Sequence, residues 1–380
     1  MEELELQQQM VEAPFGDKQV AVPGMSVLTR QAAAEGCVLL RSDGVLPLKK
    51  EQKVSVFGRC QIDTFLVGYG SGGDVHPPYQ ISILEGLKAC EGITLNETLA
   101  KVYEDWCAEH APKQQPWGKW PMSHPEMPVT AELVSEAAKE SGTALIVLGR
   151  AAGEDRENVL EQGSYYLTEQ EEQLLSLVTA QFAKTVVIMD CGNVIDMAWT
   201  TKYPISAILC PWLGGMDCGN AIADVLCGKV NPSGRLSDTI AMSYEDYPSS
   251  ANFGGQDYNN YEEDIYVGYR YFETFAKDKV LFPFGFGLSY TNFETVCEEW
   301  KAEENGISAT VRVTNVGNLA GKEVVQLYAE APQGRLGKAA ASLAAFAKTD
   351  CLAPGESHVL ALHSTYYDFA SYDDMGKPGT

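Results

Sequence analysis

Four short runs of apolar, mostly β-branched residues constrain the fold more than any other feature of this chain. Between them lie polar segments in which apolar residues recur with the spacing of a helix. Buried strands that alternate with helices predict an α/β fold, with a mostly parallel sheet and helices on both faces. The four predicted strands are Val54–Phe57, Ala144–Leu148, Thr185–Met189 and Ile205–Cys210.

The helical segments have recognisable limits. Thr168, followed three residues later by Glu171, is the pattern of a capping box and predicts that a helix begins there. The predicted helices are Asn96–Glu109, Ala131–Lys139, Glu169–Phe182 and Asp217–Leu226.

After about Leu288 the pattern changes to strand-like alternation without helices. Ser308–Gly317, Glu323–Tyr328 and His358–Leu362 alternate in this way, which is typical of a β-sandwich. The chain stops after a turn-like segment, so we expect this sandwich to be incomplete; the alternative is that the segment is a solvated tail. The predicted organisation is an N-terminal extension over 1–25, an α/β domain over 26–250, a connector over 251–287 and the sandwich over 288–380.

Charge and composition exclude several classes of function. The 28 basic and 52 acidic residues give a formal net charge of −24, which repels nucleic acid and anionic membranes. We therefore expect neither as a partner, whereas neutral ligands remain compatible with the charge. The N-terminus lacks the features of a secretory signal, and several cysteines lie in apolar segments, so we expect a cytoplasmic protein. The scattered histidines and the absence of a Cys-x-x-Cys pair give no support to a metal site.

Polar and aromatic residues follow the predicted strands at one edge of the sheet. In parallel sheets ligands bind at the carboxyl ends of the strands. Arg59 follows the first strand, Arg150 and Glu154 follow the second, and Trp212 follows the fourth. We therefore expect a binding site at this edge.

A glycine-rich segment over 68–73 also follows the first strand. It lacks the Lys-Ser/Thr ending of a phosphate-binding P-loop and the glycine spacing of a dinucleotide fold. A nucleotide-binding function is therefore not supported. We interpret the segment as a sharp loop beside the site, in which Tyr69 and Ser71 are candidate ligand contacts, with a purely structural turn as the alternative.

Three segments resemble glycoside hydrolase family 3. The match covers most of the chain, and its part over Gly214–Leu236 is long and specific. The other segments are Glu35–Leu48 and the pair Ile265–Phe272 and Phe282–Tyr290, which stand at the spacing expected for the family.

The resemblance implies a β-glucosidase-like enzyme that releases terminal, non-reducing β-D-glucosyl residues. In the common family layout, a TIM-like barrel with an aspartate nucleophile precedes the α/β domain, and a fibronectin III-like domain follows. This chain is similar to members with the reversed order, in which the barrel comes last. We therefore expect the barrel to be a missing partner and the chain alone to be inactive.

The resemblance places the acid/base residue in the loop after the second strand, within a segment that ends in Asp-Arg. Glu154, directly before Asp155 and Arg156, is our first choice, and Glu157 and Glu161 are its rivals. By itself a Glu-Asp-Arg triplet is usually a surface ion-pair cluster. Its position at a strand end, together with the resemblance, favours the catalytic interpretation.

The expected substrate is a β-linked oligosaccharide or an aryl glycoside. Asp155, Arg156, Arg150, Arg59, Ser71, Tyr69 and Trp212 are the candidate substrate contacts. No cofactor is expected, because two carboxyl groups suffice for glycoside cleavage. A non-catalytic carbohydrate-binding or scaffolding module is the alternative function.

Overall fold

The computed structural model describes residues 11–12, 18–19, 22–70, 75, 77–112, 121–154, 158–255 and 257–372. The chain divides into two compact units, Met1–Gly234 and Arg235–Thr380. Residues 235–250 pack within the second unit, since β9 (Ile240–Ala241) pairs with β10 (Val280–Phe282). Compact packing therefore changes earlier than the limit at residue 250 that we predicted for the α/β domain.

The first unit is built on a six-stranded sheet with the order β3-β8-β7-β6-β4-β5. All neighbouring strands are parallel except β3, which runs antiparallel to β8 at one edge. This confirms the mostly parallel sheet predicted from the sequence. The strands are β3 (Val38–Ser42), β4 (Gln52–Phe57), β5 (Ile93–Leu95), β6 (Thr143–Arg150), β7 (Lys184–Cys191) and β8 (Ala207–Cys210).

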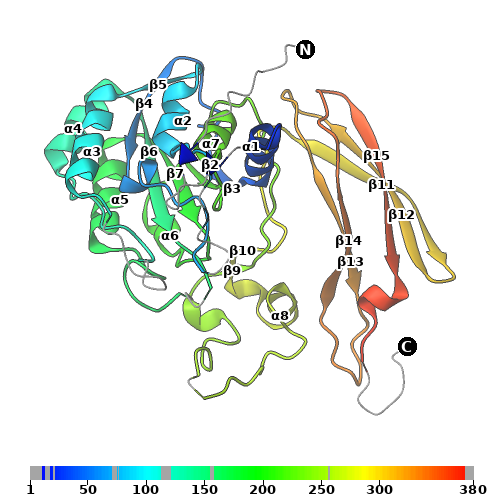
Figure 1. Cartoon of the computed structure of the whole chain (residues 1–380). Helices are drawn as coiled ribbons and strands as arrows, with labels where there is room; N and C mark the ends of the chain where they lie inside the picture. The colour runs from blue at the N-terminus through cyan, green and yellow to red at the C-terminus, as the bar shows by residue number, and fades with distance from the viewer. Residues whose placement is uncertain are drawn as a thin grey trace. The chain divides into compact units, whose positions relative to one another are not determined.

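Helices cover both faces of this sheet (Figure 1). On one face lie α3 (Glu97–Glu109), α4 (Ala131–Glu140) and α5 (Glu169–Gln181), and on the other lie α1 (Met25–Gly36), α2 (Ile83–Ala89) and α7 (Cys218–Leu226). The predicted capping box is present, because Thr168 Oγ1 accepts a hydrogen bond from Glu171 N while the Glu171 carboxylate accepts one from Thr168 N.

The centre of the sheet is the most apolar part of the unit. All eight residues of β6 are buried, as are seven of the eight in β7. Strands buried on both faces show continuous rather than alternating apolar runs, which explains the runs in the sequence. A short helix, α6 (Trp199–Lys202), follows β7, and β1 (Val11–Glu12) pairs with β2 (Lys18–Gln19) near the N-terminus.

The second unit contains a β-sandwich-like pair of sheets. One sheet has the order β11-β12-β15 and the other consists of β13 and β14, all antiparallel. Their shared core includes Val311, Val313, Leu352 and Leu362. The strands are β11 (Phe293–Glu303), β12 (Gly306–Asn315), β13 (Val324–Glu330), β14 (Ala341–Lys348) and β15 (Ser357–Thr365), and α8 (Tyr269–Phe275) precedes them.

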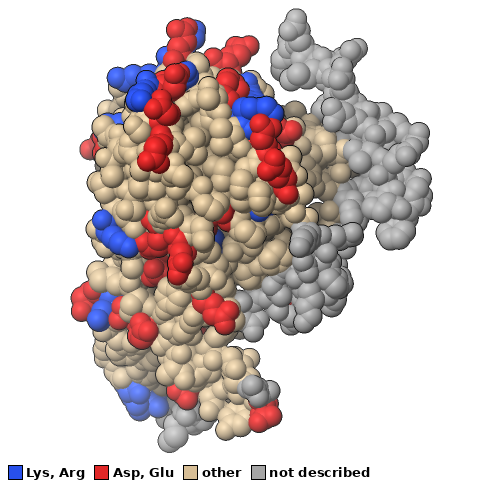
Figure 2. Space-filling model, turned by 90° about the vertical axis from the view of Figure 1, so that its left-hand side faces the viewer, with Lys and Arg blue, Asp and Glu red and all other residues tan. Residues whose placement is uncertain are grey.

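Charged side chains on the visible face of the molecule are not gathered in one place (Figure 2). On the face shown in Figure 2, acidic groups are distributed over the visible side, with basic groups among them. None of the helices in the described ranges is long and apolar enough to cross a membrane.

Candidate functional site

Glu154 lies at the carboxyl edge of the sheet, where the loops after β4 and β6 are bound to each other. Tyr69 N donates to Ala152 O at 2.6 Å, and Glu154 N donates to Tyr69 O at 3.1 Å. Tyr69 and Gly153 thereby form an isolated parallel bridge. Because β4 and β6 are neighbouring parallel strands, this bridge brings together two loops that lie far apart in the sequence.

Two glycines allow this close approach. A Cβ atom at Gly153 would lie 2.5 Å from Tyr69 O. Gly70 has a φ of +118°, and a Cβ atom there would lie 2.5 Å from Glu154 Cβ and 3.0 Å from its Oε2. A side chain at either position would push the loops apart. The Glu154 side chain is exposed, so its carboxylate can reach a ligand at this edge.

Two buried carboxyl groups that we did not predict as site residues accept hydrogen bonds from the backbone of the loop after β4. Asp190, near the end of β7, accepts a hydrogen bond from Phe65 N at 2.7 Å, and burial raises its pKa well above the usual range. Glu126 accepts one from Arg59 N at 2.8 Å. Burial raises the pKa of Glu126 to about 7, although the backbone N–H groups of Arg59 and Met127 oppose that shift.

Arg59 lies within the protein, which does not fit the substrate contact that we predicted. Its exposed fraction is 2%. The guanidinium donates to Asp63 Oδ2 at 2.6 Å, to Pro125 O at 2.9 Å and to His110 O at 2.6 Å. It also lies over the ring of Trp106, with its Cζ 5.2 Å from the ring centroid. The Arg59 guanidinium therefore bonds to protein groups and is not available to a ligand.

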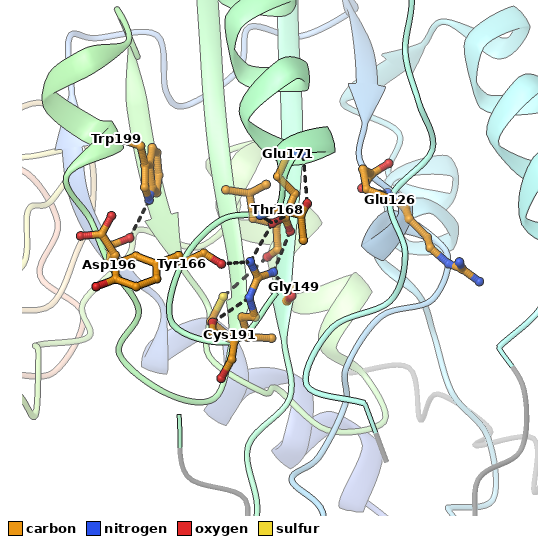
Figure 3. Close-up of polar contacts among 12 residues, drawn as sticks. Glu126, Gly149, Tyr166, Thr168, Glu171, Cys191, Asp196 and Trp199 are labelled. Carbon is orange, nitrogen blue, oxygen red and sulfur yellow. Dashed lines mark hydrogen bonds and ion pairs between the residues drawn. The ribbon is translucent and has the colours of Figure 1, made fainter. Parts of the chain in front are cut away.

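Arg150 has no exposed surface, so the predicted role in substrate contact does not fit this residue either. It forms a bidentate ion pair with Glu171 of α5, in which both N–O distances are 2.7 Å. Figure 3 shows the surrounding bonds converging from Gly149, Tyr166 and Glu171. Arg150, at the end of β6, therefore forms its hydrogen bonds with the protein rather than with a ligand.

The remaining predicted residues are placed as follows. Tyr69 is half-buried beside Glu154, and Trp212 is half-buried after β8 with a φ of 58°, an uncommon backbone conformation for a large side chain. Glu161 is exposed, and its carbonyl accepts bonds from Ser164 N at 3.3 Å and Tyr166 N at 3.1 Å. The residues that lie outside the described ranges are Ser71, Asp155, Arg156 and Glu157.

The chemistry available at this edge is that of carboxyl groups. Among the described residues, no group of three or more His, Cys, Asp or Glu side chains is arranged to hold a metal ion. All ten cysteines are free thiols, and burial raises the pKa of Cys60, Cys191 and Cys218, which disfavours the reactive thiolate form. Glu154 is thus an exposed carboxyl group directly at the bridge between the two loops.

Comparison with known families agrees with this architecture. Residues 37–290 match the model described as the glycosyl hydrolase family 3 C-terminal domain, and residues 323–378 match the fibronectin type III-like domain. The first match alone covers more than half of the chain. The chain therefore belongs to glycoside hydrolase family 3.

Individual relatives are β-glucosidases. A β-glucosidase of Ruminococcus albus is 47% identical over 347 residues, which cover 91% of this chain and 36% of the relative. Among solved structures, a β-glucosidase from Paenibacillus barengoltzii has 51% identity and a TM-score of 0.91, over 93% of this chain and 40% of that one. β-Glucosidase 3B from Thermotoga neapolitana, in complex with glucose, has 37% identity and a TM-score of 0.83, over 90% and 49%. The chain thus spans less than half the length of these relatives.

Proposed function

We propose that this chain is the acid/base-carrying part of a β-glucosidase that releases terminal, non-reducing β-D-glucosyl residues, with Glu154 as the general acid/base. The observation that carries the proposal is the bridge between Tyr69 and Gly153, which holds the exposed Glu154 carboxyl group at the carboxyl edge of the sheet. Family membership and the β-glucosidase relatives support the reaction class.

The proposed reaction retains configuration and needs two carboxyl groups about 5 Å apart on opposite sides of the glycosidic bond. In the first step Glu154 donates a proton to the leaving-group oxygen while an aspartate nucleophile bonds to the sugar. In the second step the deprotonated Glu154 takes a proton from water, the water oxygen bonds to the anomeric carbon, and the bond between that carbon and the aspartate breaks. We propose that the aspartate belongs to a barrel domain outside these 380 residues, so the chain alone does not turn over substrate.

Neighbouring side chains supply binding rather than chemistry in this proposal. Tyr69 and Trp212 offer aromatic faces on which the apolar face of a pyranose can stack. Asp155, Arg156 and Ser71 remain proposed hydrogen-bonding contacts to sugar hydroxyls. The substrate is a β-linked oligosaccharide or an aryl glycoside. No cofactor takes part in the proposed reaction, and we propose a cytoplasmic location.

The test compares Glu154→Ala with Glu157→Ala and Glu161→Ala in the barrel-containing protein. Loss of the general acid slows poor leaving groups most, so Glu154→Ala is expected to lower kcat/KM for a β-linked disaccharide by roughly 10²-fold or more. Formation of the glycosyl-enzyme from an activated aryl glucoside is expected to be affected much less.

Two outcomes contradict the proposal in different ways. If Glu154→Ala hydrolyses the disaccharide almost normally while one of the other variants does not, the acid/base residue lies further along the loop. If the unmodified barrel-containing protein binds glucosides without hydrolysing them, the alternative of a non-catalytic carbohydrate-binding module holds.

A further inference from the structure

The ion pair between Arg150 and Glu171 lies at the base of the loop that carries Glu154. The side-chain exposures of the two residues are 0% and 6%. Arg150 ends β6, and Glu171 lies in the first turn of α5, so the pair joins the start of the loop to the helix that follows it. The proposed reaction uses neither residue.

The Arg150 guanidinium uses all five of its N–H groups. Two donate to the Glu171 carboxylate, and one donates to Gly149 O of its own strand at 2.7 Å. The other two donate to the loop itself, from Nε to Ser164 O at 3.0 Å and from Nη2 to Tyr166 O at 3.2 Å. A lysine has only three donors and lacks this planar fork, so it cannot reproduce the arrangement.

Glu171 extends the same network to the end of the loop. Its Oε2 accepts from Thr168 N at 2.8 Å and from Thr168 Oγ1 at 3.2 Å, in addition to the Arg150 bond. Figure 3 shows Thr168 and Glu171 side by side at the start of the helix. The buried Glu171 carboxylate thus caps the start of α5 and also balances the charge of Arg150, which holds the loop.

A buried ion pair is by itself weak evidence for a contribution to global stability. Removing two charges from water is costly, and well-packed apolar residues in place of a buried ion pair often leave a protein as stable or more stable. What apolar residues cannot do is donate hydrogen bonds to Ser164 O and Tyr166 O. The contribution specific to the pair is therefore the conformation of the loop.

The loop after β7 is hydrogen-bonded to the loop after β6. Asn158 Nδ2 donates to Val194 O at 2.6 Å, and Asn193 Nδ2 donates to Asn158 Oδ1 at 3.2 Å. Asp196 N donates to Tyr165 O at 2.9 Å, next to the residues that Arg150 holds. Figure 3 shows the bond from the indole nitrogen of Trp199 to Asp196 O. Displacing the Arg150-held segment therefore disturbs two loops at the site edge.

We infer that Arg150 and Glu171 are positioning residues, which hold the loop after β6 in the conformation that presents Glu154 to the substrate. The catalytic part of this inference rests on the proposed function. The structural part, control of the loop by the ion pair, can be tested without any activity.

The structural test uses the 380-residue chain and the double variant Arg150→Met/Glu171→Leu, which removes both charges together. We expect the amides of Tyr165, Tyr166 and Asp196 to exchange hydrogen about tenfold faster or more, because the first two lie within or beside the carbonyls that Arg150 holds and Tyr165 O is the acceptor for Asp196 N. Amides within β6 and β7 are expected to keep their protection. Unchanged exchange of the three loop amides would overturn the inference.

A matched control is the ion pair of Arg30 with Asp224, which joins α1 to α7 with N–O distances of 2.6 and 2.7 Å. Arg30→Met/Asp224→Leu makes the same chemical change elsewhere in the unit and is expected to leave the loop amides unaffected. If the Arg150 double variant does not fold, Arg150→Lys takes its place. It keeps the charge opposite Glu171 and is expected to increase exchange of the same loop amides.

The catalytic test uses the barrel-containing protein. Displacement of a catalytic group by about 1 Å can cost roughly 10²-fold. The Arg150 double variant is therefore expected to lose disaccharide hydrolysis by at least about tenfold more than aryl-glucoside hydrolysis. Equal losses on the two substrates, as simple unfolding produces, would contradict the positioning role. Glu154→Ala is measured in parallel, and a normal disaccharide rate for that variant rejects the proposed function while the exchange result still decides the structural inference.

Discussion

Substituting Gly219 with alanine tests whether glycine is required at this position of α7 for its close packing against α2. Helices α2 and α7 contact each other through glycines, and a Cβ atom at Gly219 would lie 1.9 Å from Ser82 O and 2.5 Å from Ser82 C. The first distance falls about 1.6 Å short of the roughly 3.5 Å at which non-bonded heavy atoms pack best. The helices must therefore separate, which also stretches the bond of 3.1 Å from Gly219 N to Ile81 O.

Overpacking of this kind costs up to about 3 kcal/mol, and the better helix propensity of alanine offsets about 1 kcal/mol of it. We expect a net loss of about 2 kcal/mol, which lowers the Tm of a unit of this size by roughly 4–8 °C. Thermal unfolding followed by far-ultraviolet circular dichroism measures this loss. Gly36→Ala is the matched control, because no described atom lies within 4 Å of a Cβ atom at that helical glycine. If the Tm of Gly219→Ala lies within roughly 1–2 °C of the Tm of the unmodified protein, the loss of stability is too small for the predicted steric clash, and the packing argument is wrong.

Three further predictions concern charge, activity and stability. Because burial raises the pKa of Asp190 in the folded state, its contribution to stability is present below the unfolded pKa of about 3.9 and is lost as pH rises through the folded value. Asp190→Asn is therefore expected to gain stability relative to the unmodified protein in urea titrations as pH rises from 4 to 8, and a pH-independent difference would contradict this. The purified 380-residue chain is expected to show negligible turnover of a nitrophenyl β-glucoside, and sustained turnover by the chain alone would refute the need for an outside nucleophile. The sandwich is expected to be the less stable unit, because the strand β11 is almost fully exposed and includes Trp300, which is 70% exposed. Limited proteolysis should cut first after about Leu288. Equal hydrogen-exchange protection in both units would count against this expectation.

The sheet was predictable where its strands are buried on both faces. The four apolar runs correspond to β4, β6, β7 and β8, and the four predicted helices begin and end within about two residues of the expected limits. The short helices α2 and α6 were not predicted. Edge elements were missed. β3 pairs antiparallel with β8 and contains Arg41 with a register shift beside it, so its pattern is short and broken. β11 is rich in acid and contains a bulge between Cys297 and Glu299, which hides its alternation.

The candidate site was predictable only in part. The position of Glu154 after a strand, with glycines nearby, correctly indicated the carboxyl edge of the sheet. The roles of the arginines could not be deduced, because they depend on partners supplied by the fold. Arg150 pairs with a glutamate 21 residues away, and Arg59 bonds with the carbonyls of residues more than 50 positions further along. Strand-end arginines look alike in sequence whether they face a ligand or the protein.

The most direct test of the account is the product that Glu154→Ala forms from an activated aryl glucoside in the presence of azide. Azide is a nucleophile that needs no general base, so it can release the sugar from the covalent intermediate when Glu154 is absent. We predict faster turnover of the barrel-containing variant with azide and accumulation of a glucosyl azide with retained β configuration, identified by NMR. No acceleration and no glucosyl azide from Glu154→Ala, with both observed for Glu161→Ala instead, would contradict the assignment of Glu154 as the acid/base residue.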